Sequence, residues 1–387
     1  EALFVARGGI PLEVSPMSVL LGIELQGSTV SLLAVDRKGT VLAQLQEPVS
    51  VPFQQWWGIH PDERVRSVRA LLQHALQEGM IRPAAVAAIG ISCESSLVLV
   101  DAEMEPIPPR ALNWQELDPV ATLPRQVLRS TLASYPSILR GLHCVFDLQD
   151  WLRYRWTGAV ATTTAFAWNI GLSSSRSPGQ RWDAEELQQL GLESGQVPPL
   201  MPGPHKIGTL AEELVRETGL PRGTWFCGGG TPQAARLWLA AEPRPGQGIV
   251  LLEPDGATLW RVGGEPKSTD SIEDVIPSPY GDHWYHREAV EVADPRRGDT
   301  PIADVVHDAT SIDSEQSWSV DRESMVVSAD FGAPSRAPAL LAGVGLGWYR
   351  DLRPMWRKRC RCGSLQQWID QSIHDEGSPD VETREQT

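Results

Sequence analysis

A run of small and hydroxyl-bearing residues near the start of the chain, Gly27-Ser28-Thr29, has the composition of a phosphate-binding turn. Glycine in such a turn lets backbone amides approach a phosphate closely, and the neighbouring hydroxyl groups add hydrogen-bond donors. The same three residues also suit an ordinary hairpin turn between two strands. Both interpretations stay open at the level of the sequence.

A second candidate combines an aromatic and an acidic residue, Trp114 and Glu116. An aromatic ring can pack against the apolar face of a sugar, and a carboxylate accepts hydrogen bonds from the hydroxyl groups at the sugar's edge. A tryptophan near an acid also occurs where the pair only packs and contacts solvent. The two residues alone leave a ligand contact and a packing pair both open.

Thiol and imidazole groups give two weaker signals. Cys360 and Cys362 lie in a basic run, and neighbouring positive charges lower a thiol's pKa and favour its oxidation. A zinc site would need a second pair of ligands, which this segment lacks. Asp282, His283 and His286 are close enough to suggest a metal site, although such a group in a polar loop is more often a surface feature. We assign no residue as a metal ligand.

Composition narrows the function classes. The chain has 387 residues, 34 basic and 49 acidic side chains and a net charge of −15, which argues against a nucleic-acid partner. Its 41% hydrophobic residues suffice for a core, and its length suggests two or three domains. Five cysteines do not make a disulfide framework. We expect a soluble, cytoplasmic protein without a membrane partner, because neither a long apolar run nor a signal peptide is evident.

Hydrophobic patterning predicts the elements that position these residues. The first hundred residues indicate three consecutive strands, a helix and two further strands, the last two side by side. Their ranges are 19–26, 29–36 and 40–46, then 60–79 for the helix, then 86–92 and 97–101. Three meandering strands, a helix and a returning strand resemble the opening unit of the ribonuclease H-like, actin-like fold.

The rest of the chain is more mixed. Helices are predicted at 147–156, 184–190, 210–218 and 232–241. A strand running into a tight turn is predicted at 225–230, and a second sheet is expected to begin at 248–252. Residues 265–335 show little sustained periodicity, and residues 337–349 predict a helix of small residues that packs closely on a sheet.

Eight short segments occur in an order and spacing that point to one family. They are residues 21–29, 98–101, 109–114, 150–158, 198–202, 207–210, 218–224 and 228–230. Together they resemble the FGGY carbohydrate kinases, the family of xylulokinase, ribulokinase and gluconate kinase. The likeness runs from about residue 18 to residue 256 and returns at residues 339–352.

The resemblance implies an α/β protein with a ribonuclease H-like, actin-like ATPase fold, built on a mixed sheet with helices, and a reduced second domain. The corresponding division is an N-terminal extension over 1–17, an FGGY-type sugar-kinase domain over 18–247, a reduced C-terminal actin-like domain over 248–358, and a polar tail over 359–387.

Members of this family transfer the terminal phosphoryl group of ATP to a sugar hydroxyl, with Mg²⁺ and a carboxylate that accepts the hydroxyl proton. In the family this carboxylate is an aspartate directly after three glycines. Here Thr231 follows Gly228, Gly229 and Gly230. A threonine hydroxyl cannot accept the proton as a carboxylate does, and the lost contribution is on the order of 10²–10⁴-fold in rate. The resemblance thus implies Thr231 at the catalytic position and Gly229 and Gly230 at the nucleotide.

The phosphate loops also depart from the family pattern. The resemblance implies nucleotide contacts from Glu24, Gly27, Ser28 and Thr29, but Gln26 stands where the family has glycine. The second loop, a Gly-Thr-Ser-Gly run in the family, is Glu-Pro-Asp-Gly over residues 253–256. Two carboxylates repel a polyphosphate and proline offers no amide donor, so a solvated turn is the better interpretation.

The sugar site keeps part of the pattern. Trp114 and Glu116 match the family's tryptophan and acid, with glutamate in place of aspartate. A second family aspartate aligns with Thr163 and is lost.

Two functions follow from these departures. The first is a catalytically impaired or noncatalytic pseudokinase that binds a sugar, a polyol or a protein partner and needs no cofactor. The alternative is an active carbohydrate kinase that uses ATP and Mg²⁺ on a pentulose, hexose or polyol, with Glu24 or Glu116 as the base. The sequence leaves the oligomeric state open, and a homodimer is one arrangement it allows.

Overall fold

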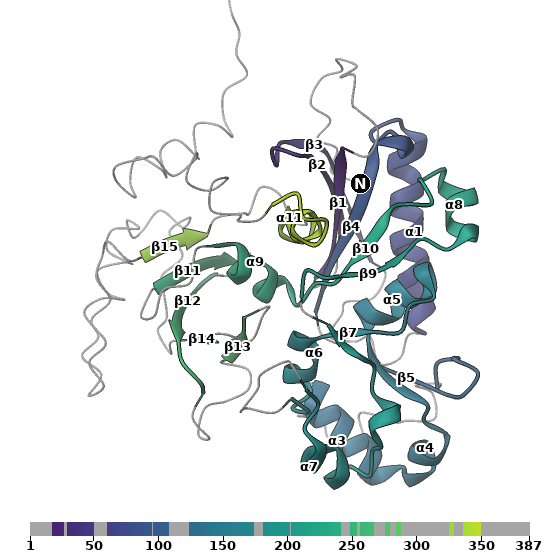
Figure 1. Cartoon of the computed structure of the whole chain (residues 1–387), viewed down its shortest axis with the longest axis vertical. Helices are drawn as coiled ribbons and strands as arrows, with labels where there is room; N and C mark the ends of the chain where they lie inside the picture. Colours follow the sequence, from purple (N-terminus) through teal and green to yellow (C-terminus); the bar gives the residue numbers. More distant parts are fainter. Residues whose placement is uncertain are drawn as a thin grey trace, which may run out of the picture.

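The computed structural model describes residues 18–26, 29–49, 60–94, 96–107, 124–173, 181–201, 203–240, 248–253, 256–266, 275–278, 284–287, 325–328 and 336–349. Two sheets dominate this part of the chain, and helices lie on both faces of the first of them (Figure 1). Within the described ranges, none of the helices has both the length and the hydrophobicity that a bilayer crossing requires.

The first sheet has six strands in the order β3-β2-β1-β4-β10-β9. Their bounds are β1 Val19–Gln26, β2 Thr29–Asp36, β3 Val41–Pro48, β4 Val86–Cys93, β9 Lys206–Thr209 and β10 Trp225–Cys227. β1, β2 and β3 form an antiparallel meander, and β4 joins β1 in parallel. The predicted mixed sheet is therefore confirmed, and the predicted ranges of β1 and β2 coincide with the observed ones.

One pairing predicted from the sequence is wrong. β5 (Leu97–Val100) does not lie beside β4 but pairs antiparallel with β6 (Cys144–Asp147) in a separate sheet. The reason is that β1 and β10 already occupy the two edges of β4. With no free edge on β4, the chain has to turn away and complete its hydrogen bonds elsewhere.

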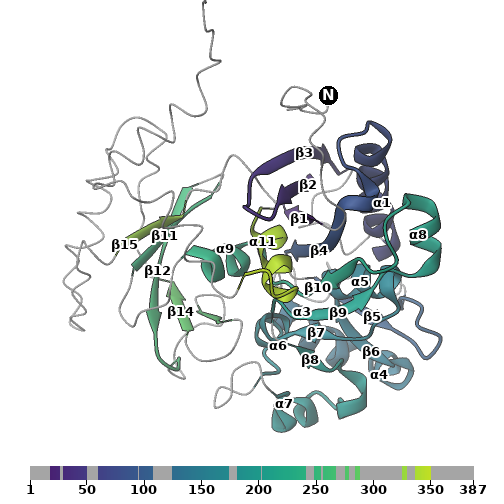
Figure 2. The same cartoon turned by 45° about the horizontal axis from the view of Figure 1, so that its top comes forward.

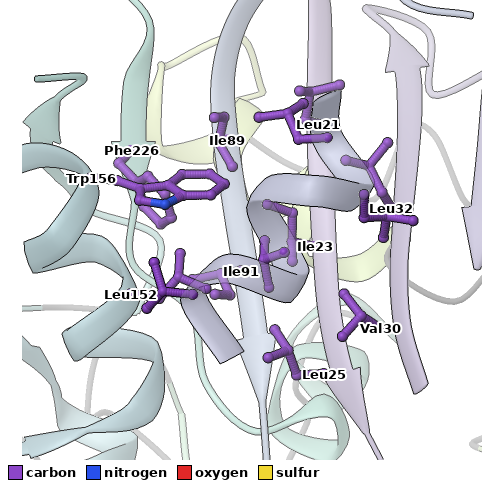
Figure 3. Close-up of a cluster of buried hydrophobic side chains, with 14 of the residues drawn as sticks. Leu21, Ile23, Leu25, Val30, Leu32, Ile89, Ile91, Leu152, Trp156 and Phe226 are labelled. Atoms are coloured by element: carbon purple, nitrogen blue, oxygen red, sulfur yellow. The ribbon is translucent and has the colours of Figure 1, made fainter. Parts of the chain in front are cut away.

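Three helices cover one face of the first sheet: α1 (Pro61–Gln77), α5 (Leu148–Thr157) and α8 (Glu212–Thr218). Alternate residues of the strands point at these helices and form a buried aliphatic layer, part of which Figure 3 shows. Trp156 of α5 packs edge-on against Phe226 of β10, with 5.8 Å between ring centroids. The layer anchors the strands whose ends form the candidate site.

The helix α11 (Arg336–Gly345) packs on the other face of this sheet against β1 and β4. It confirms the predicted small-residue helix, but it ends at Gly345 and not at residue 349. The approach is so close that a side chain on Gly90 of β4 would place its Cβ 1.9 Å from the carbonyl oxygen of Pro338. Small residues along α11 are what permit this contact.

The second sheet has five strands in the order β13-β14-β12-β11-β15. Their bounds are β11 Gly248–Glu253, β12 Gly256–Gly263, β13 Val275–Pro277, β14 Trp284–Arg287 and β15 Met325–Ser328. β11 pairs antiparallel with β12 and parallel with β15, and β12 pairs antiparallel with β14. This repeats the pairing of β1 with β2 and β4, and of β2 with β3.

The helices α9 (Pro232–Ala240) and α11 lie between the two sheets (Figures 1 and 2). One hydrophobic cluster joins Leu20 of β1, Ala342 of α11 and Ile249 of β11. The two sheets therefore share a core through these helices.

The remaining elements are short helices, 3₁₀ turns and one short strand pair. They are the helices α3 Pro124–Ser134, α4 Pro136–Gly141, α6 Thr164–Asn169 and α7 Ala184–Gln189, the 3₁₀ turns at Pro83–Ala85 and Ser194–Gln196, and the paired strands β7 Thr162–Thr163 and β8 Leu200–Met201. The four helices predicted in the middle of the chain correspond to α5, α7, α8 and α9, with boundary differences of one or two residues. The division into domains at residue 247 stays a prediction.

Candidate functional site

The candidate site lies where β1 and β4 end, on the face of the sheet opposite α1. Strand residues alternate between faces, so Ile23 and Leu25 join the layer under α1 while Glu24 and Gln26 point the other way. The parallel register places Glu24 of β1 directly beside Ser92 of β4. β1 and β4 thus place the polar side chains of Glu24 and Ser92 next to each other on this face.

Glu24 is almost fully buried, with 3% of its surface exposed, and both of its carboxylate oxygens have partners. Arg236 of α9 donates from Nη2 to Oε1 at 2.9 Å, and the Ser92 hydroxyl donates to Oε2 at 3.3 Å. The same Nη2 donates to Oε1 of Gln26 at 3.0 Å. A buried carboxylate needs such partners because leaving it unpaired costs several kcal/mol, about 3–5 by analogy with broken buried pairs.

Thr231 precedes the first residue of α9 and serves as a helix cap. Its hydroxyl oxygen accepts the backbone N–H of Ala234 at 3.1 Å, and its carbonyl accepts the N–H of Ala235 at 2.9 Å. Pro232 follows in the first helical position, where a missing N–H costs nothing. The residue at the predicted catalytic position therefore has a local structural role.

The three glycines before Thr231 are required by packing. A Cβ on Gly229 would lie 1.7 Å from the carbonyl oxygen of Ile91, and one on Gly228 would lie 2.4 Å from the carbonyl oxygen of Gly203. The carbonyl of Gly230 accepts the N–H of Cys93 at 3.3 Å. These contacts press the turn against the end of β4, which explains the glycines without any ligand.

A buried polar cluster lies at the start of α5. Asp147 caps the helix, accepting the N–H groups of Leu148 at 2.7 Å and Ser96 at 2.9 Å. Asp150 completes a capping box and pairs with Arg153 at 2.7 Å. Asp150 also accepts the hydroxyl hydrogen of Thr162. The three charged side chains are fully buried, so the cluster is a rigid internal network.

Burial shifts the titration of both aspartates in this cluster. Burial, and next the negative charge of Asp150, raise the pKa of Asp147 to about 8. Burial also raises the pKa of Asp150, which Arg153 opposes. The two aspartates therefore share an environment that disfavours carrying two negative charges.

Several buried polar atoms in α5 and at the start of α6 have no hydrogen-bond partner among the described residues. They are Oε1 of Gln149, Oγ1 of Thr163, Oγ1 of Thr164, and Nε and Nη1 of Arg153. Gln149 Oε1 lies 3.6 Å from the Cβ position of Gly229, and Thr163 Cγ2 lies 3.2 Å from that of Gly228. Thr163 is fully buried at the start of α6. Its hydroxyl cannot supply the charge of the aspartate that the resemblance places there.

The structure brings together part of the predicted site. Glu24, Gly229, Gly230 and Thr231 gather around the ends of β1 and β4. Thr29 begins β2 opposite Gln26, and its hydroxyl donates to the Gln26 carbonyl at 3.1 Å, as a hairpin closure does.

Other predicted residues lie outside the described part of the chain: Gly27, Ser28, Trp114, Glu116, Pro254, Asp255, Asp282, His283, Cys360 and Cys362. Of the suggested metal group, His286 is described, and its Nε2 lies 2.9 Å from the carbonyl oxygen of Gly264. Across the described ranges there is no group of three or more His, Cys, Asp or Glu residues that could hold a metal ion.

Arg236 and the Asp147 cluster are site residues that sequence reasoning missed. Arg236 lies 212 positions from Glu24, and a helix residue of this type is usually exposed. The cluster did leave a signal, because Asp147, Asp150 and Arg153 are spaced by three residues, as in a capping box followed by an i, i+3 ion pair.

The raised pKa of Asp147 predicts that stability falls as pH rises. In the folded state Asp147 has a pKa of about 8, whereas an aspartate in an unfolded chain has a pKa of about 3.9. Between these values unfolding releases the proton, so raising the pH favours unfolding by up to about 1.4 kcal/mol per unit. Urea unfolding at about pH 5.5 and about pH 7.5 measures this loss.

The matched control for this prediction is Asp147→Asn, which keeps a good capping side chain and removes the titration. The pH dependence of its unfolding free energy is expected to be flatter than that of the wild type. An equally steep dependence in the variant would show that Asp147 does not hold the proton.

No family model matches the chain, and no curated protein does. Solved structures do match. Ligand-bound xylulose kinase and gluconate kinase, both from Lactobacillus acidophilus, each have a TM-score of 0.66 and 13% identity and cover 88% of this chain and 91% of their own. Plasmodium falciparum glycerol kinase with ADP has a TM-score of 0.56 and 12% identity, covering 85% of this chain and 76% of its own. At such identities the likeness concerns the fold: the chain has the α/β fold of carbohydrate kinases.

Proposed function

We propose that this protein is a noncatalytic FGGY-type pseudokinase, a sugar-kinase scaffold that binds a ligand without transferring a phosphoryl group. The observation that carries the proposal is the role of Thr231. Its hydroxyl caps α9 at the position where the family has its catalytic carboxylate. A threonine hydroxyl is far less basic than a carboxylate, and this one already accepts a helix N–H. It therefore cannot take a proton from a sugar hydroxyl.

The alternative of an active kinase needs another base. Of the two carboxylates that the sequence suggested, Glu24 is already bonded through both oxygens to Arg236 and Ser92. These contacts hold the carboxylate in a fixed position against α9 and β4. Glu116 lies outside the described residues. The contacts of Glu24 therefore favour the noncatalytic proposal.

Mg²⁺, which the kinase fold implies, does not fit the described site. A magnesium ion binds to carboxylates and phosphates with near-octahedral geometry. Glu24 is the carboxylate that the sequence assigns to the phosphate loop, and its oxygens are occupied by a guanidinium and a hydroxyl. We therefore derive no catalytic step through a metal ion.

The ligand that fits the proposal is a sugar or polyol, or a protein partner that uses the scaffold. The named substrates of the neighbouring structures are small polyhydroxylated molecules, which supports the first of these. The domain division at residue 247 and a cytoplasmic location belong to the same proposal.

The expected result for nucleotide binding is the absence of saturable heat when ATP with Mg²⁺ is titrated into the protein. Enzymes typically have KM values of about 1 μM to 1 mM for their substrates. ATP binding in this family uses a glycine at position 26 and a carboxylate at position 24 that is free to act at the phosphates. Here position 26 is glutamine, and Glu24 is paired with Arg236. Isothermal calorimetry up to several millimolar ATP provides the measurement.

The same titration with EDTA in place of Mg²⁺ is the control for nonspecific heat. Saturable binding within this KM range that disappears with EDTA would contradict the proposal, because it would show an intact nucleotide site.

A further inference from the structure

The end of β1 contains a fixed positive charge that the sequence did not indicate. We propose that Arg236 is an internal cation that neutralises Glu24 and thereby excludes a divalent metal ion from this site. The inference rests on the proposed function for the location of the site, but its test uses neither nucleotide nor sugar.

The geometry of the arginine is specific to this place. Glu24 and Gln26 are two positions apart on β1, so their side chains emerge on the same face of the sheet. Nη2 of Arg236 donates to Oε1 of each, at 2.9 and 3.0 Å, and one nitrogen with two hydrogens is thereby saturated. The side chain of Arg236 is only 12% exposed. It is thus held by both strand residues at once.

Both oxygens of the carboxylate already accept hydrogen bonds. Oε1 accepts from Arg236 and Oε2 accepts from the buried Ser92 hydroxyl. A divalent ion bound to either oxygen would lie beside the Arg236 guanidinium, which carries a charge of like sign. Because the pair is buried, solvent screens this repulsion only weakly, and the guanidinium already balances the charge that would attract the ion.

Removing the guanidinium should allow a metal ion to bind at Glu24. With methionine at position 236, the long apolar stem is retained while Glu24 becomes a buried carboxylate without a cation. Such a group gains most from binding a cation, and oxygen ligands suit Mg²⁺ and Mn²⁺. The variant should therefore acquire the metal affinity that the wild type lacks.

The experiment is a Mn²⁺ titration followed by electron paramagnetic resonance, which counts bound ions per chain. Arg236→Met is expected to bind one more Mn²⁺ than the wild type and to unfold at a temperature that rises with Mn²⁺. Adding Glu24→Gln to that variant is expected to abolish both effects. Arg222→Met is the matched control, because it frees Glu212 from an exposed ion pair and should not create a comparable site.

Two results would overturn the inference. One is a folded Arg236→Met variant that binds no additional ion. The other concerns the single substitution Glu24→Gln and does not depend on whether Arg236→Met folds. If Glu24→Gln removes a Mn²⁺ ion that the wild type binds, then Glu24 binds the metal while Arg236 is present. Equal Mn²⁺ counts in wild type and Glu24→Gln support the inference even if Arg236→Met does not fold. The Mn²⁺ counts do not measure phosphoryl transfer. The result of this experiment is therefore separate from the test of the proposed function, which measures ATP binding and turnover.

Discussion

Replacing Thr231 by aspartate is expected to leave the protein without sugar phosphorylation, although it supplies the carboxylate that the family uses. The losses are distributed over the site. Glu24 is bound to Arg236, and Thr163 has no charge where a second acid is expected. Phosphoryl transfer needs positioned phosphates and charge stabilisation together with a base, so these losses multiply.

The Thr231→Asp variant should fold normally, which makes its lack of activity informative. Aspartate is as good a helix cap as threonine or better, so it can still accept the N–H of Ala234. The new carboxylate is then held at the start of α9 in place of the hydroxyl. We expect the unfolding temperature to change little.

A coupled ADP-release assay over pentuloses, hexoses and polyols measures the effect of this substitution. The expected result is sugar-dependent turnover indistinguishable from the blank. Rescue to within tenfold of ordinary kinase rates, about 1–100 per second, would show that the phosphate site is intact and that the assigned roles of Glu24 and Arg236 are wrong.

Gly229→Ala is expected to destabilise the protein by about 3 kcal/mol or more, the upper end of typical overpacking costs. The new methyl group would lie 1.7 Å from the carbonyl oxygen of Ile91. Backbone atoms of a central strand cannot move aside as a flexible side chain can. The turn would have to lift away from β4, which breaks the hydrogen bond from Cys93 to Gly230.

Gly141→Ala is the matched control, because Gly141 is the last residue of α4 and has open space around its Cβ position. Its stability should stay the same or rise slightly, by about 0.5–1 kcal/mol. Thermal and urea unfolding of both variants provide the comparison. Equal stability of the two variants would mean that the glycine turn is not held against β4 as described.

The parts of the fold that the sequence predicted well have long, regular patterns. The strands Val19–Gln26 and Thr29–Asp36 are aliphatic for most of their length, and α5 has both a capping aspartate and a following glycine. Strands of three or four residues, such as β13 and β14, are too short for any periodicity to be recognised. This is why residues 265–335 gave no prediction of a sheet.

The candidate site was predicted in part for a related reason. The position of Thr231 followed from local sequence, since three glycines directly precede it. The partner of Glu24 did not, because Arg236 comes from a helix more than two hundred residues later and only the folded sheet brings the two together. Pairing of β5 with β6 was missed likewise, because it depends on which strand edges are already occupied.

The most direct test of the noncatalytic account is the turnover of the wild-type protein in the ADP-release assay, with ATP and Mg²⁺ in excess and the full panel of sugars and polyols. The account predicts no sugar-dependent ADP release above the blank for any of them. Sugar-dependent turnover by the wild type near ordinary kinase rates, on the order of 1–100 per second, would contradict it and establish an active kinase with an unrecognised base.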